Sequence, residues 1–399
     1  MKMKSLILGA AGIMAATGAQ AADLPVAPEP VDYVRVCDAY GSGFYYIPGT
    51  ETCLRVGGGI RAEYRVWDYD TNYRFNRRFG AAVNQGPTTS TRARAYVRLD
   101  SRTNTEFGLL RTYLDVWFTG DSYGGTSGTT VTLWNAFIQL GGLTAGRATS
   151  FFDFYTGDTF ESVIDLAQSD RKTNLLAYTA AFGNGFSASV SLEDGTFRAH
   201  GIGVPALVPV VGNGYGWHRF PDLVANLRVD QGWGSAQVMG ALHDVRDAYA
   251  FGGDDSEVGF AIGAGATFNL PMIAPGDSVS FQVAYADGAT DYLAPDVGLD
   301  GYYRGNGTIA TVTGWSASGG FTHFWTPEVA SSFTASYVDI DNPAIGASDF
   351  DQWDIQANIK WMPVSGLTIG AEIEYEDTNF AVGPDSDRWV GLFRIQRMF

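Results

Sequence analysis

Residues 91–99 read Thr-Arg-Ala-Arg-Ala-Tyr-Val-Arg-Leu, a run in which polar and apolar side chains alternate. Successive side chains of an extended chain point to opposite faces, so the small and apolar residues share one face: Ala93, Ala95, Val97 and Leu99. The other face carries three arginines and a tyrosine: Arg92, Arg94, Arg98 and Tyr96. This pattern predicts a β-strand that borders an apolar environment on one side and water on the other.

The same alternation recurs along the chain. It predicts sixteen strands, at residues 54–68, 89–100, 106–118, 130–140, 142–148, 173–182, 186–194, 221–230, 234–244, 257–270, 278–287, 310–324, 329–339, 352–362, 366–376 and 387–399. A half-buried sheet of a soluble protein would also alternate. The connections favour another fold, because they alternate between short turns and long loops, as in a closed membrane barrel. We therefore predict an all-β fold, a sixteen-stranded antiparallel transmembrane β-barrel with short periplasmic turns and long outer loops.

The first 21 residues predict an export signal. Lys2 and Lys4 precede an apolar stretch, and Ala19-Gln-Ala21 matches a signal-peptide cleavage site. The apolar stretch is too short to anchor the chain as a membrane-spanning helix. We therefore expect residues 1–21 to be removed on export.

The chain has only two cysteines, Cys37 and Cys53. Both follow the signal peptide, and the bacterial envelope is oxidising, so we expect a structural disulfide between them. Closing this loop would stabilise the fold by roughly 3 kcal/mol on chain-entropy grounds. A redox or metal-binding pair is the alternative, but C-x-x-C spacing and flanking histidines are missing. We divide the chain into a signal peptide (1–21), a periplasmic lead-in and disulfide loop (22–53) and a barrel (54–399).

Composition and motifs exclude several classes of function. The 43 acidic and 26 basic residues give a formal charge of −17, which argues against a nucleic-acid partner. The four histidines are scattered without metal-ligand spacing. G-x-S-x-G, H-E-x-x-H and P-loop motifs do not occur. We therefore predict no catalytic residues, no cofactor and no metal, and a protein that is not an enzyme.

Several segments resemble one known family. They are residues 33–55 (YVRVCDAYGSGFYYIPGTETCLR), 172–186 (KTNLLAYTAAFGNGF), 191–195 (SLEDG) and 389–399 (WVGLFRIQRMF). These segments resemble the alphaproteobacterial porin family, the rhizobial and brucella-type porins. The resemblance implies a homotrimer of sixteen-stranded, water-filled barrels in the bacterial outer membrane, with a loop folded into each pore. The final strand, which ends at Phe399, resembles the assembly signal of outer-membrane barrels.

The charge pattern predicts where the pore narrows. A wide barrel has a polar lumen, and arginines that faced lipid instead would each cost roughly 2–4 kcal/mol near the midplane. The inward set forms a basic wall: Arg61, Arg65, Arg92, Arg94, Arg98, Arg111 and, if the turn before it preserves the register, Arg147. The third long loop, residues 149–172, is acidic and predicts an inward-folded constriction loop. Its acids are Asp153, Asp158, Glu161, Asp165 and Asp170. The alternative is that these charges form ordinary local ion pairs, for example between Asp170 and Lys172.

The leading functional hypothesis is an outer-membrane general-diffusion porin for small hydrophilic solutes and ions. The alternative is a substrate-specific channel, for example sugar-selective, whose site loop aromatics could form: Tyr215, Trp217, Tyr302 and Tyr303. A barrel enzyme and a plugged adhesin barrel are further classes. The expected partners are two further copies of the chain, outer-membrane lipid, lipopolysaccharide and the barrel-assembly machinery. Small residues that would allow close barrel packing support the trimer: Gly57, Gly59, Ala93 and Ala95.

Overall fold

The computed structural model describes residues 35–69, 89–123, 127–203, 214–216, 218–246, 256–304, 308–343 and 349–399. The expected signal peptide (1–21), the first part of the lead-in (22–34) and Trp217 lie outside these ranges. Within them, no helix is long and apolar enough to cross a membrane.

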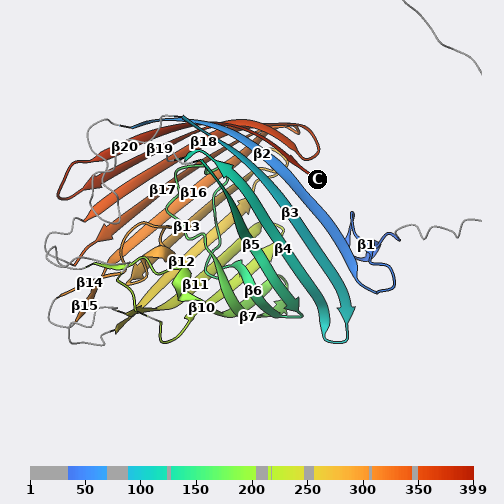
Figure 1. Cartoon of the computed structure of the whole chain (residues 1–399), viewed down its shortest axis with the longest axis horizontal. Coiled ribbons are helices and arrows are strands. Elements are labelled where there is room, and N and C mark those ends of the chain that lie inside the picture. Colours follow the sequence, from blue (N-terminus) through green and yellow to red (C-terminus); the bar gives the residue numbers. More distant parts are fainter. Residues whose placement is uncertain are drawn as a thin grey trace, which may run out of the picture.

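Sixteen long strands form a closed antiparallel barrel (Figure 1). Each strand pairs with the next long strand along the chain, and the last pairs with the first. The strands are β2 (Cys53–Tyr69), β3 (Thr89–Thr105), β4 (Gly108–Asp121), β5 (Gly128–Leu140), β6 (Leu143–Thr149), β7 (Lys172–Gly183), β8 (Phe186–Glu193), β10 (Asp222–Gln231), β11 (Gly234–Arg246), β12 (Ser256–Asn269), β13 (Ser278–Asp287), β16 (Thr313–Thr326), β17 (Val329–Asp341), β18 (Phe350–Val364), β19 (Leu367–Phe380) and β20 (Ser386–Met398). The predicted sixteen-stranded fold is confirmed.

The barrel has a short-turn rim and a long-loop rim. The short turn between β3 and β4 lies at the right of Figure 1, together with the C-terminus and the two-residue strand β1 (Tyr45–Tyr46). At the short-turn rim the seam between β2 and β20 is completed by Gly58 and Phe399, whose backbones exchange two hydrogen bonds of 3.0 Å. The small strands β14 (Gly301–Tyr303) and β15 (Ile309–Thr311), which belong to a long connection, lie at the left.

The barrel wall is apolar outside and polar inside. On β13, Ser280 and Gln282 are buried and point inward, whereas Phe281 and Val283 point outward and are each 53% exposed. A soluble protein would bury its aromatic and aliphatic side chains. The reversed pattern is that of a barrel whose outer face meets lipid.

Two details of the strands differ from expectation. The predicted strand 310–324 is divided, because β15 (Ile309–Thr311) leaves the barrel and pairs with β14 (Gly301–Tyr303). β14 also pairs with β9 (Ile202–Gly203), so two long loops share a small sheet. In addition, Gly57 and Gly59 lie opposite Arg98 and Tyr96 and so belong to the inward set, not to an outer packing face.

The predicted disulfide is present. Cys37 and Cys53 are bonded, with their Cα atoms 6.0 Å apart, and both are fully buried. Phe44 packs against both cysteines, and the guanidinium groups of Arg55 and Arg102 lie over its ring at 5.1 and 4.9 Å. The disulfide loop is therefore fixed to the short-turn ends of β2 and β3.

Part of the lumen holds an apolar core. The loop at residues 288–300 folds into the barrel, where Tyr292, Leu293 and Val297 are fully buried. They pack against small and aliphatic side chains on the inner wall of β11, β12, β13 and β17, and against the third long loop. The wall residues include Ala241, Ala261, Ala284, Ala286 and Val338. This second infolded loop narrows the open cross-section of the barrel.

Candidate pore constriction

The third long loop follows the inner wall of the barrel. It leaves β6 at Thr149 and returns to β7 at Lys172. Aromatic side chains of this loop pack against wall glycines: Phe152 on Gly263, Phe154 on Gly265, Tyr155 on Gly320 and Phe160 on Gly370. A Cβ atom on Gly370 would come within 2.7 Å of Phe160 Cζ. The glycines therefore provide the space that holds the loop against β12, β16 and β19, as predicted for an inward-folded loop.

Two carboxylates of β19 bind the backbone at the tip of the loop. Glu372 accepts hydrogen bonds from the N–H groups of Phe160 and Glu161, at 2.5 and 3.0 Å. Glu374 accepts three more, from Ser162 at 2.8 Å, Val163 at 3.3 Å and Ile164 at 2.9 Å. The chain turns sharply here, with Glu161 in the left-handed region at φ 47°. Five hydrogen bonds to two neighbouring inward side chains of β19 therefore fix the tip.

An apolar contact completes the attachment of the tip. Ile164 is fully buried between Trp67 of β2 and Val390 of β20. Its carbonyl accepts a hydrogen bond of 2.8 Å from Gln356 Nε2. The loop thus reaches round the barrel as far as β2. The arginines of β3 and β4 lie on the next strands beyond this tip.

The five predicted acids of the loop have different surroundings. Asp153 is buried and accepts from Arg198 at 3.0 Å, and Asp170 pairs with Lys172 at 3.3 Å. Asp158 accepts from the Tyr155 hydroxyl at 3.2 Å, and Glu161 accepts from the Leu166 N–H at 2.9 Å. Asp165 is exposed. The anticipated local pair between Asp170 and Lys172 is therefore found.

Burial changes the titration of two of these acids. It raises the pKa of Asp158 above the ordinary value for an aspartate. It raises the pKa of Glu161 well above the ordinary value, although the Leu166 N–H acts in the opposite direction. The negative charge of the loop is therefore sensitive to pH.

Most of the predicted wall arginines are paired with carboxylates on neighbouring strands. One row across β20, β2, β3 and β4 alternates in charge: Arg394, Glu63, Arg92 and Asp121. Arg92 donates to Glu63 at 3.2 Å and to Asp121 at 2.7 Å. Asp121 also accepts from Arg65. Towards the short-turn rim, Arg98 bonds to Asp115 at 2.9 Å and Arg111 to Asp100 at 3.0 Å.

Arg147 does not belong to the basic wall. It lies opposite Ala136 and Asn174, which alternate with the inward-facing Phe137 and Leu175. The predicted position assumed that the turn before Arg147 keeps odd residues opposite odd residues. The two-residue turn at Gly141–Gly142 instead places odd-numbered residues of β5 opposite even-numbered residues of β6. The inward-facing Phe137 therefore lies opposite Gly146, and Arg147 points outward.

Sequence reasoning missed the partners that organise the site. Glu63, Asp115 and Asp121 occupy inward positions on the same strands as the arginines. Arg394 donates to Glu63 at 2.7 Å and to the Phe160 carbonyl at 3.2 Å. The parity of each strand would have indicated all four, because they alternate with outward apolar residues.

A buried ion cluster joins the base of the third loop to the loop at 288–300. Asp291 accepts from Arg171 at 2.6 Å, Arg198 at 3.1 Å and His200 at 2.5 Å. Burial alone would raise the pKa of Asp291, but His200 and Arg171 outweigh it and hold that pKa far below its ordinary value. Burial would lower the pKa of His200, but Asp291 outweighs it and raises that pKa.

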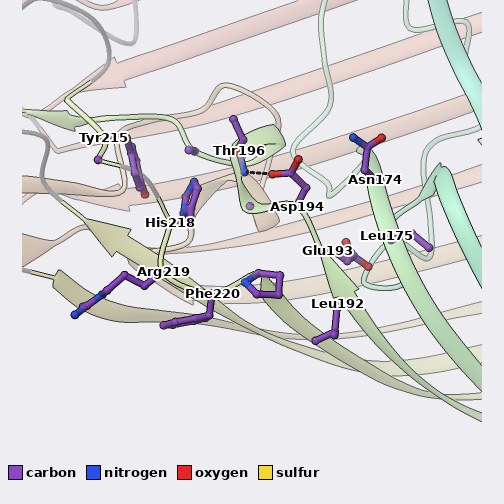
Figure 2. A pocket seen from close by; sticks show the side chains of 14 residues that line it. Asn174, Leu175, Leu192, Glu193, Asp194, Thr196, Tyr215, His218, Arg219 and Phe220 are labelled. Carbon is purple, nitrogen blue, oxygen red and sulfur yellow. Dashed lines mark hydrogen bonds between the residues drawn. The ribbon is translucent and has the colours of Figure 1, made fainter.

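The long-loop rim has a pocket of about 740 Å³ where β7 and β8 meet residues 195–199, 215–216 and 218–221 (Figure 2). The Asp194 carboxylate accepts from the Thr196 N–H at 3.1 Å, and His218 Nδ1 lies 3.2 Å from the Asp244 carbonyl. The Tyr215 hydroxyl donates to Asp300 at 2.7 Å. These polar groups tie the loops together. Within the described ranges, no group of three or more His, Cys, Asp or Glu side chains could hold a metal ion.

Two of the other loop tyrosines pack within the loops. Tyr303 belongs to an apolar cluster with Ile202, Val245 and Ile309, and Tyr215 packs against it. Tyr302 packs against the apolar core of the lumen. These three tyrosines therefore pack within the loops. The alternative of a substrate-specific channel uses them as candidates for a solute site.

Comparisons with known proteins agree with this architecture. A family model described as "Porin subfamily" matches residues 23–389. Porin Omp2b of Brucella suis is 34% identical over 425 aligned residues, which cover 100% of both chains. The outer membrane channel DcaP of Acinetobacter baumannii has a similar fold, with a TM-score of 0.72 at 17% identity over 89% of this chain and 99% of that one. The trimer form of OmpT from Vibrio cholerae has a TM-score of 0.51 at 9% identity over 88% of this chain and 100% of that one.

Proposed function

Since the chain belongs to the porin subfamily and is therefore an outer-membrane channel, we propose that it is a general-diffusion porin. Small hydrophilic solutes and ions would cross it passively through a water-filled lumen, without cofactor or energy coupling. The observation that carries this proposal is the third loop, which lies inside a closed barrel and is fixed to the inner wall from β12 round to β2.

The lumen is charged on both sides of the proposed passage. Four guanidinium groups pair with two carboxylates on one part of the wall: Arg61, Arg65, Arg92 and Arg394 with Glu63 and Asp121. Arg94 lies opposite Arg61 on the same part of the wall. We place Asp158, Glu161 and Asp165 of the third loop on the other side, whereas Asp153 and Asp170 pair with Arg198 and Lys172. Opposed charges of this kind create a transverse field, which orients water and polar solutes and disfavours apolar ones. The constriction between wall and loop is part of the proposal.

Single-channel recording in planar bilayers tests the proposed function. The purified protein should give stepwise, ohmic conductance in potassium chloride, with little change when small neutral sugars are added. Saturable block by one sugar would indicate the alternative, a substrate-specific channel. A folded protein that gives no conductance steps would be a plugged barrel and would refute the proposal.

We also propose that the barrel is a homotrimer in contact with outer-membrane lipid and lipopolysaccharide. The exposed aromatic and aliphatic outer face supports the lipid contact, and the trimer form of OmpT is a precedent in a protein of similar fold. A native mass near that of a single chain in mild detergent would contradict the trimer.

The final strand is proposed as the signal for the barrel-assembly machinery. Phe399 is 77% exposed, so its side chain is available at the end of β20. Deleting Phe399 should lower the amount of assembled barrel in the membrane, and unchanged assembly would refute this role.

A further inference from the structure

One row of the lumen wall contains two arginines and no carboxylate. Arg61 of β2 lies directly opposite Arg94 of β3, and the row continues to Gln396 of β20 and Thr119 of β4. Like charges directly opposite each other on neighbouring strands are destabilising. The adjacent row, with Glu63 and its partners, alternates in sign. The Arg61–Arg94 row is therefore a local excess of positive charge.

Arg94 has no carboxylate within ion-pair distance among the described residues. Its Nε donates to Thr119 Oγ1 at 2.9 Å, and its guanidinium lies over the Trp117 ring at 4.5 Å. Arg61 donates to Gln396 at 2.8 Å, and it reaches Glu63 only at 3.6 Å. Glu63 already accepts from Arg394 and Arg92. Among the residues that the structure describes, neither arginine of the row therefore has a carboxylate of its own.

An aromatic stack holds Arg94 in place. Trp117 stacks on Trp134 of β5 with ring centroids 3.8 Å apart. Trp134 is the extra residue of a bulge, because Asp115 pairs with Asn135 while Val116 pairs with Leu133. A bulge re-aims the side chain that it contains, and here it places a second indole behind the first. The stack uses the face of the Arg94 guanidinium and Thr119 takes its Nε–H group, whereas among the described residues its two terminal nitrogens have no carboxylate partner.

A guanidinium can stack through its face and bind a carboxylate through its edge at the same time. Arg94 is half-buried, so it is fixed on one side and accessible on the other. We propose that the Arg61–Arg94 row is a binding station for the carboxylate group of small organic acids that pass through the pore. The station rests on the proposed open channel and adds a ligand class to it. Because the site lies in a wet lumen, binding is weak enough for the solute to leave.

Benzoate is the probe for this station. Single-channel currents in potassium chloride are recorded with increasing benzoate, and with benzamide as the neutral control of the same shape. Benzoate should interrupt the current in a saturable way, and benzamide should not. In Arg94→Gln the half-blocking concentration should rise roughly tenfold, as expected for the loss of a charged hydrogen-bonding partner.

Two further variants test whether benzoate binds specifically at the Arg61–Arg94 row or is only attracted by the overall positive charge of the wall. Arg94→Lys keeps the charge but loses the fork, so block should weaken there as well. Arg98→Gln combined with Asp115→Asn removes a neutral pair from the same wall, so block should persist. Equal block in the wild type and Arg94→Gln, or full block in Arg94→Lys, would overturn the station while leaving the channel itself established. If Arg94→Gln does not assemble, Arg61→Gln is measured with the same criteria. A wild type without any conductance would refute the proposed function instead.

Discussion

The ring of Phe160, in the third loop, packs directly on Gly370 of β19 and fills the space that a side chain at position 370 would need. A Cβ atom on Gly370 would lie 2.7 Å from Phe160 Cζ. The same loop residue has its N–H bound to Glu372, two positions further along β19. One short segment of wall therefore fixes both the ring and the backbone of the loop tip.

Replacing Gly370 with valine should displace the loop tip. Overpacking of this kind typically costs about 1–3 kcal/mol, which is comparable to the hydrogen bonds that hold the tip. We expect a changed single-channel conductance and broader current noise. The control is Gly391→Val on β20, where the nearest atom to an added Cβ is 3.8 Å away. Identical conductance in wild type and Gly370→Val would show that the loop position does not set the pore.

The basic wall should govern ion preference. Replacing Arg94 and Arg98 with serine should raise conductance and shift the channel towards cations. An interaction of about 1 kcal/mol per charge would change the permeability ratio roughly fivefold. Zero-current potentials across a potassium chloride gradient measure this change. Arg147→Ser is the matched control, because Arg147 lies on the outward parity; an equal shift there would contradict the wall assignment.

The acids of the loop should make ion preference depend on pH. The pKa values of Asp158 and Glu161 are raised, so these carboxyls take up protons above the ordinary range near pH 4. Lowering the pH should therefore remove negative charge from the loop before ordinary carboxyl groups titrate, and should shift the channel towards anions. In the Asp158→Asn, Glu161→Gln double variant this shift should shrink, and the effect of the Glu161 amide should be largest at high pH. Equal pH profiles of ion preference in the wild type and the double variant would refute the role of these two acids.

Removing the charge of Asp291 should release the loop at 288–300. Arg198 is only 1% exposed and would keep Asp153 as an acceptor, but the cluster would lose one of the two carboxylates that compensate its buried positive charge, which is destabilising. Hydrogen exchange of residues 288–300 should become faster in Asp291→Asn. Asp296→Asn is the control, since Asp296 is 69% exposed and its contacts are 3.6 Å long. Unchanged exchange in Asp291→Asn would mean that the apolar core alone holds the loop.

The strands could be predicted because their information is local. Each alternates in sequence, and lipid on one side forbids a shift of one residue. The third loop was also recognisable, since its acids are concentrated in one segment. The side chains that hold this loop could not be recognised from the sequence, because they are distant in the chain. Glu372 lies 212 positions from the Phe160 N–H that it binds.

The second infolded loop could not be predicted for a similar reason. Residues 288–300 resemble any long connection, and their burial depends on small wall residues such as Ala241 and Ala261 on distant strands. The error at Arg147 was avoidable, because it followed from the length of a turn that the sequence displays.

The seam between β2 and β20 has a consequence for the rate of folding. It joins residues that lie 335 positions apart in the chain, as in the pair formed by Arg61 and Gln396. Contacts between such distant segments form slowly, because closing a long loop costs entropy before the pairing returns any free energy. Until then, both edge strands present unpaired backbone groups that can recruit strands of other chains. The rate at which β2 pairs with β20 therefore determines how long each newly made chain can aggregate.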